Sequence, residues 1–150
     1  MSIWAAVAGF YPQHRFAQYT TAYDGGDGSQ TFAYNVQVNI TDLSKWLSWW
    51  TSTCDWNARM RALVYETASR APNYRYYIGA GSRHTIWPYD KVYTDTKGGV
   101  PRMVDWVQAM RTGSPAWTNV ECTDCTLLDG DPNPLQPPFN ADGTVSCPAP

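Results

Sequence analysis

A histidine near the middle of the chain is the residue whose type and setting most clearly indicate chemistry. His84 follows an aromatic and aliphatic run at 74–78, and a small-residue turn at 79–83 lies between them. The chain has only two histidines, and the other, His14, lies in a polar turn. A histidine just past the carboxyl end of a buried strand is suited to general-base catalysis, because its imidazole changes charge near neutral pH. The pattern therefore predicts a base at His84.

Two carboxylates lie earlier in the chain, on a glycine-rich segment. Asp24 and Asp27 belong to segment 24–29, which follows the aromatic and β-branched run 15–21. Such a segment is ordinarily a surface turn, and Asp27 also suits a helix cap. A calcium site would need a full ligand loop and a distal glutamate, so no metal is predicted here. Paired with His84, either carboxylate would orient the imidazole and stabilise its charged form.

The elements that must position these groups follow from the apolar periodicity. The segment 2–9 is a weak helix candidate, 30–50 reads as mainly helical in one or two pieces, and 55–69 is the clearest helix. A further helix follows the glycines at 98–99, after a loop at 88–97. Because helices separate the two strand runs, we expect an α/β fold whose parallel sheet carries its functional groups beyond the carboxyl ends of the strands.

The C-terminal end differs in composition from the rest of the chain. Six of the eleven prolines lie in 132–150. We therefore expect a partial α/β domain over 1–125 and an extended, partly disordered tail over 126–150. The acidic segment 129–133 has a calcium-like spacing, but a plain turn is the preferred interpretation.

The four cysteines favour disulfides. Cys122 and Cys125 form a Cys-Thr-Asp-Cys unit, whereas Cys54 and Cys147 stand apart. Four cysteines allow three pairings, which the sequence leaves open. A zinc site would normally need a second close pair. Disulfides point to an oxidising compartment outside the cytoplasm.

Composition excludes some classes of partner. The net charge is -2 and the pI about 5.5, which argues against nucleic acid and anionic membranes as partners. Aromatic residues make up 15% of the chain and charged residues 16%, which fits a secreted protein acting on lipid, glycan or cell-wall material, or simply an aromatic core. The tryptophans 46, 49 and 50 are assigned to the core rather than to a substrate wall. No apolar run is long enough for a membrane span, and we expect any export signal upstream of Met1.

No serine nucleophile is evident. An α/β hydrolase places its triad in the chain order serine, acid, histidine, with the serine in a Gly-x-Ser-x-Gly turn. Ser82 lacks this spacing and lies beside His84 in the wrong order, and Ser29 lacks the following glycine. The nucleophile is therefore expected upstream of this chain.

Four blocks of the sequence resemble the C-terminal part of pectin acetylesterase-like proteins, a family that includes the Notum-type carboxylesterases. The resemblance covers about 15–125. It lies in 16–21 followed by the Asp-x-x-Gln of 27–30, in 74–86, in the Gly-Gly-Val-Pro of 98–101, and in 117–125.

The resemblance implies an α/β-hydrolase fold and a secreted serine carboxylesterase that removes acetyl groups from pectin or a fatty acyl group from a signalling protein. It implies His84 as catalytic base and Asp27 as acid, with Asn35 eight residues after that aspartate. Asp24 is nearer the strand end, so both aspartates stay candidates. The implied partner is an acylated carbohydrate or other ester, with no cofactor, and the oligomeric state is open. Without the serine and the oxyanion hole, the isolated chain is expected to be a nearly inactive fragment.

Two other functions fit parts of the sequence. The aromatic richness would suit a carbohydrate-binding module, although such modules are mostly β-sandwiches and the helical stripes oppose one. An inactive structural homologue would retain the acid and histidine loops without turnover.

Overall fold

The protein is built on a parallel sheet. The computed structural model describes residues 3–24, 29–83, 86–87, 90–126 and 145–147. The sheet has three strands in the order β1-β2-β3, namely β1 (Phe16–Thr21), β2 (Tyr74–Gly79) and β3 (Val120–Glu121). Phe16 is the partner of Tyr74, and Thr21 is the partner of Gly79. Since β1 and β2 pair over their full lengths, their carboxyl ends lie side by side.

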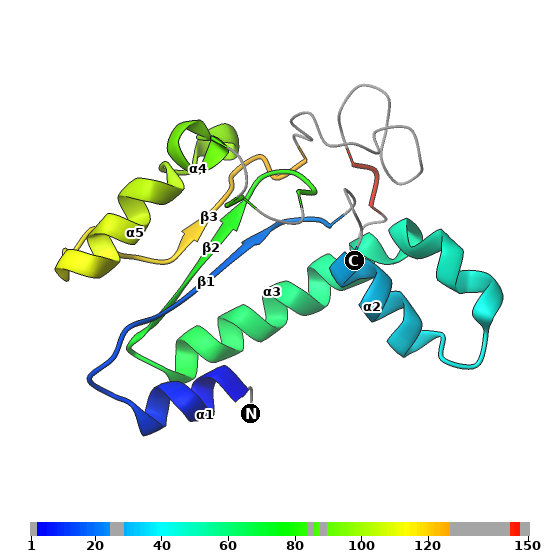
Figure 1. Cartoon of the computed structure of the whole chain (residues 1–150), viewed down its shortest axis with the longest axis horizontal. Helices are drawn as coiled ribbons and strands as arrows, with labels where there is room; N and C mark the ends of the chain where they lie inside the picture. The colour runs from blue at the N-terminus through cyan, green and yellow to red at the C-terminus, as the bar shows by residue number, and fades with distance from the viewer. Residues whose placement is uncertain (1–2, 25–28, 84–85, 88–89, 127–144, 148–150) are drawn as a thin grey trace.

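Helices cover both faces of this sheet. Figure 1 shows α1 and α3 on one side of the strands and α4 and α5 on the other. The α-helices are α1 (Ile3–Phe10), α2 (Ser29–Val38), α3 (Thr53–Arg70), α4 (Lys91–Thr94) and α5 (Met103–Thr112). Two 3-10 helices, η1 (Leu43–Ser52) and η2 (Lys97–Gly99), complete the described elements.

The longest helix, α3, covers one face of the sheet with a single stripe of side chains. Trp56, Met60 and Val64 recur every four residues, and all three are buried in the main core cluster. This spacing places them on one side of the helix, so the polar residues between them face solvent. Pro72 follows the helix closely, in keeping with the preference of the residue before a proline for extended backbone.

The opposite face is covered by α5. Met103 and Trp106 are buried, and the Trp106 ring packs edge-on against Tyr77 of β2, with 5.5 Å between the ring centroids. Trp106 Nε1 donates to the carbonyl of Thr118, at 2.8 Å. The helix ends at Gly113, whose φ of 69° lies in the left-handed region that glycine adopts without strain.

The predicted α/β class is confirmed, with a parallel sheet and flanking helices. The strand runs 15–21 and 74–78 correspond to β1 and β2, and the helix 55–69 corresponds to α3. Segment 30–50 divides into α2 and the 3-10 helix η1. The predicted loop 88–97 contains the short helix α4, and β3 was not predicted. The described sheet is not the β-sandwich of most carbohydrate-binding modules.

Both cysteine pairs are disulfides. One joins Cys54 to Cys147, and the other joins Cys122 to Cys125. Val145 is buried in the core, so this part of the C-terminal segment is packed rather than extended into solvent. The acidic segment 129–133 lies outside the described residues.

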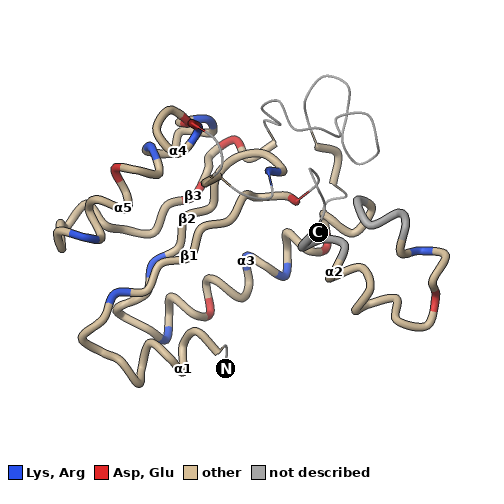
Figure 2. The backbone as a smooth tube through the Cα atoms, viewed as in Figure 1, with Lys and Arg blue, Asp and Glu red and all other residues tan. Residues whose placement is uncertain are grey.

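Charge is distributed without a dominant sign. Figure 2 shows basic and acidic residues interspersed along the described chain. Among the described helices, none combines the length and the apolarity that a membrane span requires.

Candidate functional site

The carboxyl ends of β1 and β2 are joined beyond the sheet ladder itself. The amide of Ala22 donates to the carbonyl of Gly79 at 2.8 Å, and the amide of Tyr23 donates to the carbonyl of Gly81 at 2.9 Å. The segments that follow β1 and β2 thus remain hydrogen-bonded to each other for two residues beyond the strands. This is the edge of a parallel sheet at which functional groups usually gather.

A buried hydroxyl joins the same two segments. Thr21 Oγ1 lies 2.6 Å from the carbonyl oxygen of Tyr23 and 2.6 Å from that of Arg83. One hydroxyl at the end of β1 therefore contacts the residue before Asp24 and the residue before position 84. This contact could not be predicted from the sequence, because Thr21 and Arg83 are 62 positions apart.

Asp24 lies directly beyond this junction and is only 1% exposed. Its amide donates to Thr53 Oγ1 at 3.1 Å, and the Thr53 hydroxyl lies 3.3 Å from the Asp24 carbonyl oxygen. Thr53 is the first residue of α3, so the start of that helix fixes the backbone of the acid loop.

The side chain of Asn57, one turn into α3, braces the same loop. Its Nδ2 donates to the carbonyl of Ala22. The acid loop is thus held from two sides, by β2 and by the first turns of α3.

The other two predicted catalytic residues, Asp27 and His84, lie outside the described residues. The chain is fixed on both sides of the histidine position. Arg83 and Asp95 form an ion pair whose side chains are 8% and 11% exposed, with Nη2 and Oδ2 2.6 Å apart. On the other side, Ile86 is buried in the core. The sequence did not identify Arg83 and Asp95 as partners, because their pairing depends on the turn between β2 and α4.

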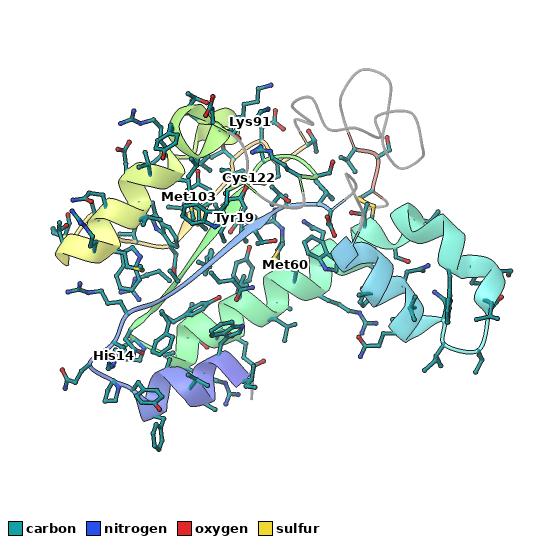
Figure 3. All side chains as sticks on the ribbon, in the orientation of Figure 1. His14, Tyr19, Met60, Lys91, Met103 and Cys122 are labelled. Atoms are coloured by element: carbon teal, nitrogen blue, oxygen red, sulfur yellow. A yellow bond between two sulfur atoms is a disulfide. The ribbon has the colours of Figure 1, made fainter. Side chains whose placement is uncertain are left out.

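The positions of Ser82 and His14 argue against a catalytic role for either residue. Ser82 is buried, so its hydroxyl is closed to a substrate arriving from solvent. Figure 3 shows His14 at the end of the molecule remote from Cys122, which follows β3 at the carboxyl edge of the sheet. The carbonyl of His14 accepts from Asn73 Nδ2 at 2.8 Å, which is a structural contact at the amino end of the strands.

Asn35 is a buried structural residue. Its Nδ2 donates to the carbonyl of Lys45 at 2.7 Å, and its Oδ1 accepts from Ser52 Oγ at 2.7 Å and from Asn39 Nδ2 at 3.0 Å. These bonds join α2 to η1. Trp46 belongs to the same region, where its Nε1 donates to the carbonyl of Asn39 at 3.0 Å.

A hollow of about 720 Å³ lies between β1 and the helices α1, α2 and α3. Its lining includes the consecutive strand residues Gln18, Tyr19 and Thr20. Successive side chains of a strand point to opposite faces, so a hollow lined by all three lies along the outer edge of β1. Sequence reasoning missed this feature, since its walls come from elements far apart in the chain.

The phenol next to Asp24 is kept neutral. Burial raises the pKa of Tyr23, and the Arg61 guanidinium offsets part of that rise. A neutral phenol remains a hydrogen-bond donor throughout the physiological range.

Comparisons with protein-family models, with curated proteins and with solved structures found no match to this chain.

The chemistry of the site therefore has to be argued from its residues. The described residues contain no cluster of three or more histidine, cysteine or acidic side chains that would hold a metal ion. What the geometry provides is a carboxylate-bearing loop after one parallel strand, hydrogen-bonded to the turn that follows its neighbour. An acid and a base delivered by these two loops would stand at one edge of the sheet, as acid–base catalysis requires.

Proposed function

We propose that this chain is the C-terminal portion of a secreted serine ester hydrolase of the pectin acetylesterase-like group, with an α/β-hydrolase fold. It would supply the acid and the histidine of a Ser-Asp-His triad. The serine and the oxyanion donors would come from a segment outside this sequence. The substrate class is an acyl ester, with an acylated carbohydrate as the first choice.

The observation that carries the proposal is the junction between the loops that follow β1 and β2. Backbone bonds from Ala22 and Tyr23 and the hydroxyl of Thr21 hold the acid loop against the turn that leads to position 84. Such a junction supports a shared role for the two loops, because a simple surface turn after β1 would not need contacts to residues 81 and 83. The two disulfides are in keeping with a protein of an oxidising compartment.

Each residue would have a defined part in the reaction. His84 takes the proton from the serine hydroxyl as the serine oxygen attacks the ester carbonyl, and then gives it to the leaving alcohol. Water hydrolyses the acyl-serine by the same route in reverse. The carboxylate accepts a hydrogen bond from the other ring nitrogen, which fixes the tautomer and stabilises the imidazolium.

Two aspartates compete for the role of the acid. Asp27 has the spacing of the resembling family, with Gln30 three residues later and Asn35 eight residues later. Asp24 has the burial and the position at the strand end. We take Asp27 as the first choice, with Asp24 as the structural base of the loop and the second candidate.

The serine would arrive from the β1 side of the sheet. Within the described sheet, β1 is an edge strand of six residues, and the hollow lies beside it. The other edge is formed by β3, which has two residues. A sheet that continues past β1 would bring a nucleophile-bearing turn to the same carboxyl edge as the acid and the histidine.

Hydrolysis of p-nitrophenyl acetate tests the proposal. The isolated chain should hydrolyse this ester no faster than its His84→Ala variant. A protein in which a Gly-x-Ser-x-Gly segment precedes this chain should be active, and His84→Ala should lower its kcat by about 10³-fold or more. Asp27→Asn and Asp24→Asn in that protein identify the acid, with the larger loss at the catalytic carboxylate.

An unchanged kcat in the His84→Ala variant of the active protein would overturn the assignment. A full-length protein that fails to react with a serine-directed phosphonate would instead favour an inactive homologue.

A further inference from the structure

The two disulfides differ greatly in the length of chain that they close. Cys54 and Cys147 are 93 positions apart, whereas Cys122 and Cys125 are 3 positions apart. A crosslink restrains the unfolded chain less as its loop becomes shorter. The Cys122–Cys125 bond therefore has to be understood from its local contacts.

Those contacts lie on the carboxyl end of β2. The amide of Cys122 donates to the carbonyl of Ile78 at 3.0 Å, and the carbonyl of Cys125 accepts from the amide of Gly81 at 3.1 Å. The crosslinked loop is thus hydrogen-bonded to Ile78, near the end of β2, and again to Gly81, two residues beyond the strand. Because the carbonyl of Gly81 accepts from Tyr23, the path of hydrogen bonds continues to the acid loop.

The loop is closely fitted to its surroundings. Gly98 has a φ of 68°, and a Cβ at this position would lie 2.6 Å from the carbonyl oxygen of Asp124 and 2.9 Å from Cys122 Cβ. The amide of Thr123 donates to the carbonyl of Gly98 at 2.7 Å. A shift of the crosslinked loop would therefore break contacts to the neighbouring segment.

A guanidinium lies on one of the two sulfur atoms. Arg61 Nη2 is 3.2 Å from Cys125 Sγ, and the same side chain forms an ion pair with Glu121. Cys125 is half-buried. A cation beside a cysteine sulfur stabilises its thiolate, which favours the reduced form of the pair.

We infer that Cys122, Cys125 and Arg61 form a reducible clamp that positions the turn after β2. Oxidised, the clamp holds Gly81 and, through it, Tyr23. Reduced by a dithiol, it releases them. Only the functional role of the clamp rests on the proposed function, because the turn at 79–83 that it holds leads to His84.

The reaction is a thiol–disulfide exchange. A dithiol reductant loses two electrons and forms its own disulfide, while the Cys122–Cys125 bond accepts two electrons and breaks. One sulfur of the protein keeps a proton from the dithiol. The other is released as the Cys125 thiolate beside Arg61, and the second proton goes to solvent.

Titration with dithiothreitol tests the clamp. The purified full chain is equilibrated at a series of ratios of reduced to oxidised dithiothreitol, quenched with acid and alkylated, and the labelled cysteines are counted by peptide mass spectrometry. Cys122–Cys125 should open at a ratio about tenfold lower than Cys54–Cys147. Equal midpoints, or earlier opening of Cys54–Cys147, would overturn the inference.

Substitutions of Arg61 test the role of its charge. Arg61→Met should raise the ratio needed to open Cys122–Cys125 by about tenfold, and Arg61→Lys should stay closer to the unaltered protein. Arg70→Met is the matched control, because Arg70 is on the same helix and pairs with Glu66. An unchanged midpoint in Arg61→Met, or an equal shift in Arg70→Met, would contradict the inference.

Amide hydrogen exchange measures what the clamp holds. In the Cys122→Ser/Cys125→Ser variant, the amides of Gly81 and Tyr23 should exchange about tenfold faster or more, while that of Val64 in α3 is unchanged. Equal exchange at Gly81, or faster exchange at all three, would show that the bond does not position the turn. None of these three measurements depends on a serine nucleophile, so failure of the proposed hydrolase leaves these results interpretable.

Discussion

The two edges of the sheet differ in how completely they are covered. Next to β3, the crosslinked loop 122–125 is hydrogen-bonded to the end of β2. Trp106 of α5 packs on Tyr77 of β2, and its Nε1 donates to the carbonyl of Thr118 just before β3. On the β1 side, a hollow of about 720 Å³ follows the edge strand, and nearby Ile3 and Leu63 are 76% and 55% exposed.

This difference bears on function. Six residues without a charge or a proline make β1 an edge that lacks the usual protection against pairing with another strand. An exposed apolar surface next to such an edge is typical of a site that another segment covers. The β3 side, which is covered, lies next to the turn that leads to the histidine. The β1 side, which is exposed, is the side from which the proposed serine would come.

The largest expected effect contrasts two tryptophans, one from each side. Trp106→Ala should lower the free energy of unfolding by about 3 to 5 kcal/mol, because the side chain is buried and its Nε1 bonds Thr118. Trp4→Ala, at a half-exposed residue of the hollow, should cost less than about 1 kcal/mol. Urea unfolding followed by circular dichroism measures both. Similar losses would mean that the β1 side is as well packed as the β3 side.

Proline substitutions at two neighbouring residues of β1, made one at a time, distinguish the side of the strand that pairs with β2 from the side that faces away from β2. The backbone amides of Phe16 and Ala22 donate to the chain of β2 and its immediate flank. The amides of even-numbered residues in β1 therefore face β2, and those of odd-numbered residues face away from it. Gln18→Pro should therefore cost about 3 kcal/mol, and Ala17→Pro less than about 1 kcal/mol.

Urea unfolding again provides the measurement, and Gln18→Ala separates the loss of the bond between the Tyr74 hydroxyl and Gln18 Oε1. If Ala17→Pro destabilised the chain as strongly as Gln18→Pro, the outer edge of β1 would already be paired, contrary to the proposed entry of the serine-bearing part.

The smallest expected effect concerns alkaline pH. Burial raises the pKa of Tyr74, where β2 is covered by α1 and α3, from 10.0 to about 12. The folded chain therefore keeps this phenol neutral at a pH where the unfolded chain ionises it. The buried neutral phenol of Tyr74 contributes fully to the free energy of unfolding below pH 10. Between pH 10 and 12 the free energy of unfolding falls by about 2 to 3 kcal/mol in total. Unfolding by urea at each pH tests this, and Tyr74→Phe should reduce the loss. A flat profile would contradict it.

The elements with a strong local signal could be predicted from the sequence. The apolar stripe of Trp56, Met60 and Val64 is a property of the helix itself, and the β-branched and aromatic runs of β1 and β2 mark strands without reference to their neighbours. The two-residue strand β3 has no periodicity of its own and forms only through pairing with Tyr77 and Ile78.

The site could be predicted only in part. The sequence places Asp24 close to the end of the first strand run, and Asp24 is buried directly beyond β1. The spacing that favours Asp27 concerns a residue outside the described part of the chain, so the choice of acid stays a prediction. The contacts of Thr53 and Thr21 were not predictable, because each depends on a segment that folding brings from far along the chain. The disulfide pairing was open for the same reason: it depends on α3 and the C-terminal segment meeting at Cys54.

In the proposed site, the loops after β1 and β2 together present a carboxylate to the imidazole of His84. Nuclear magnetic resonance of the histidine ring protons tests it directly in the isolated chain. With two histidines, the spectrum is simple, and His14→Gln assigns it. We expect one His84 ring N–H signal that is protected from exchange with water and that disappears in Asp27→Asn or in Asp24→Asn. A His84 ring proton that exchanges as rapidly as that of His14, and is unaffected by both substitutions, would show that neither aspartate orients this imidazole.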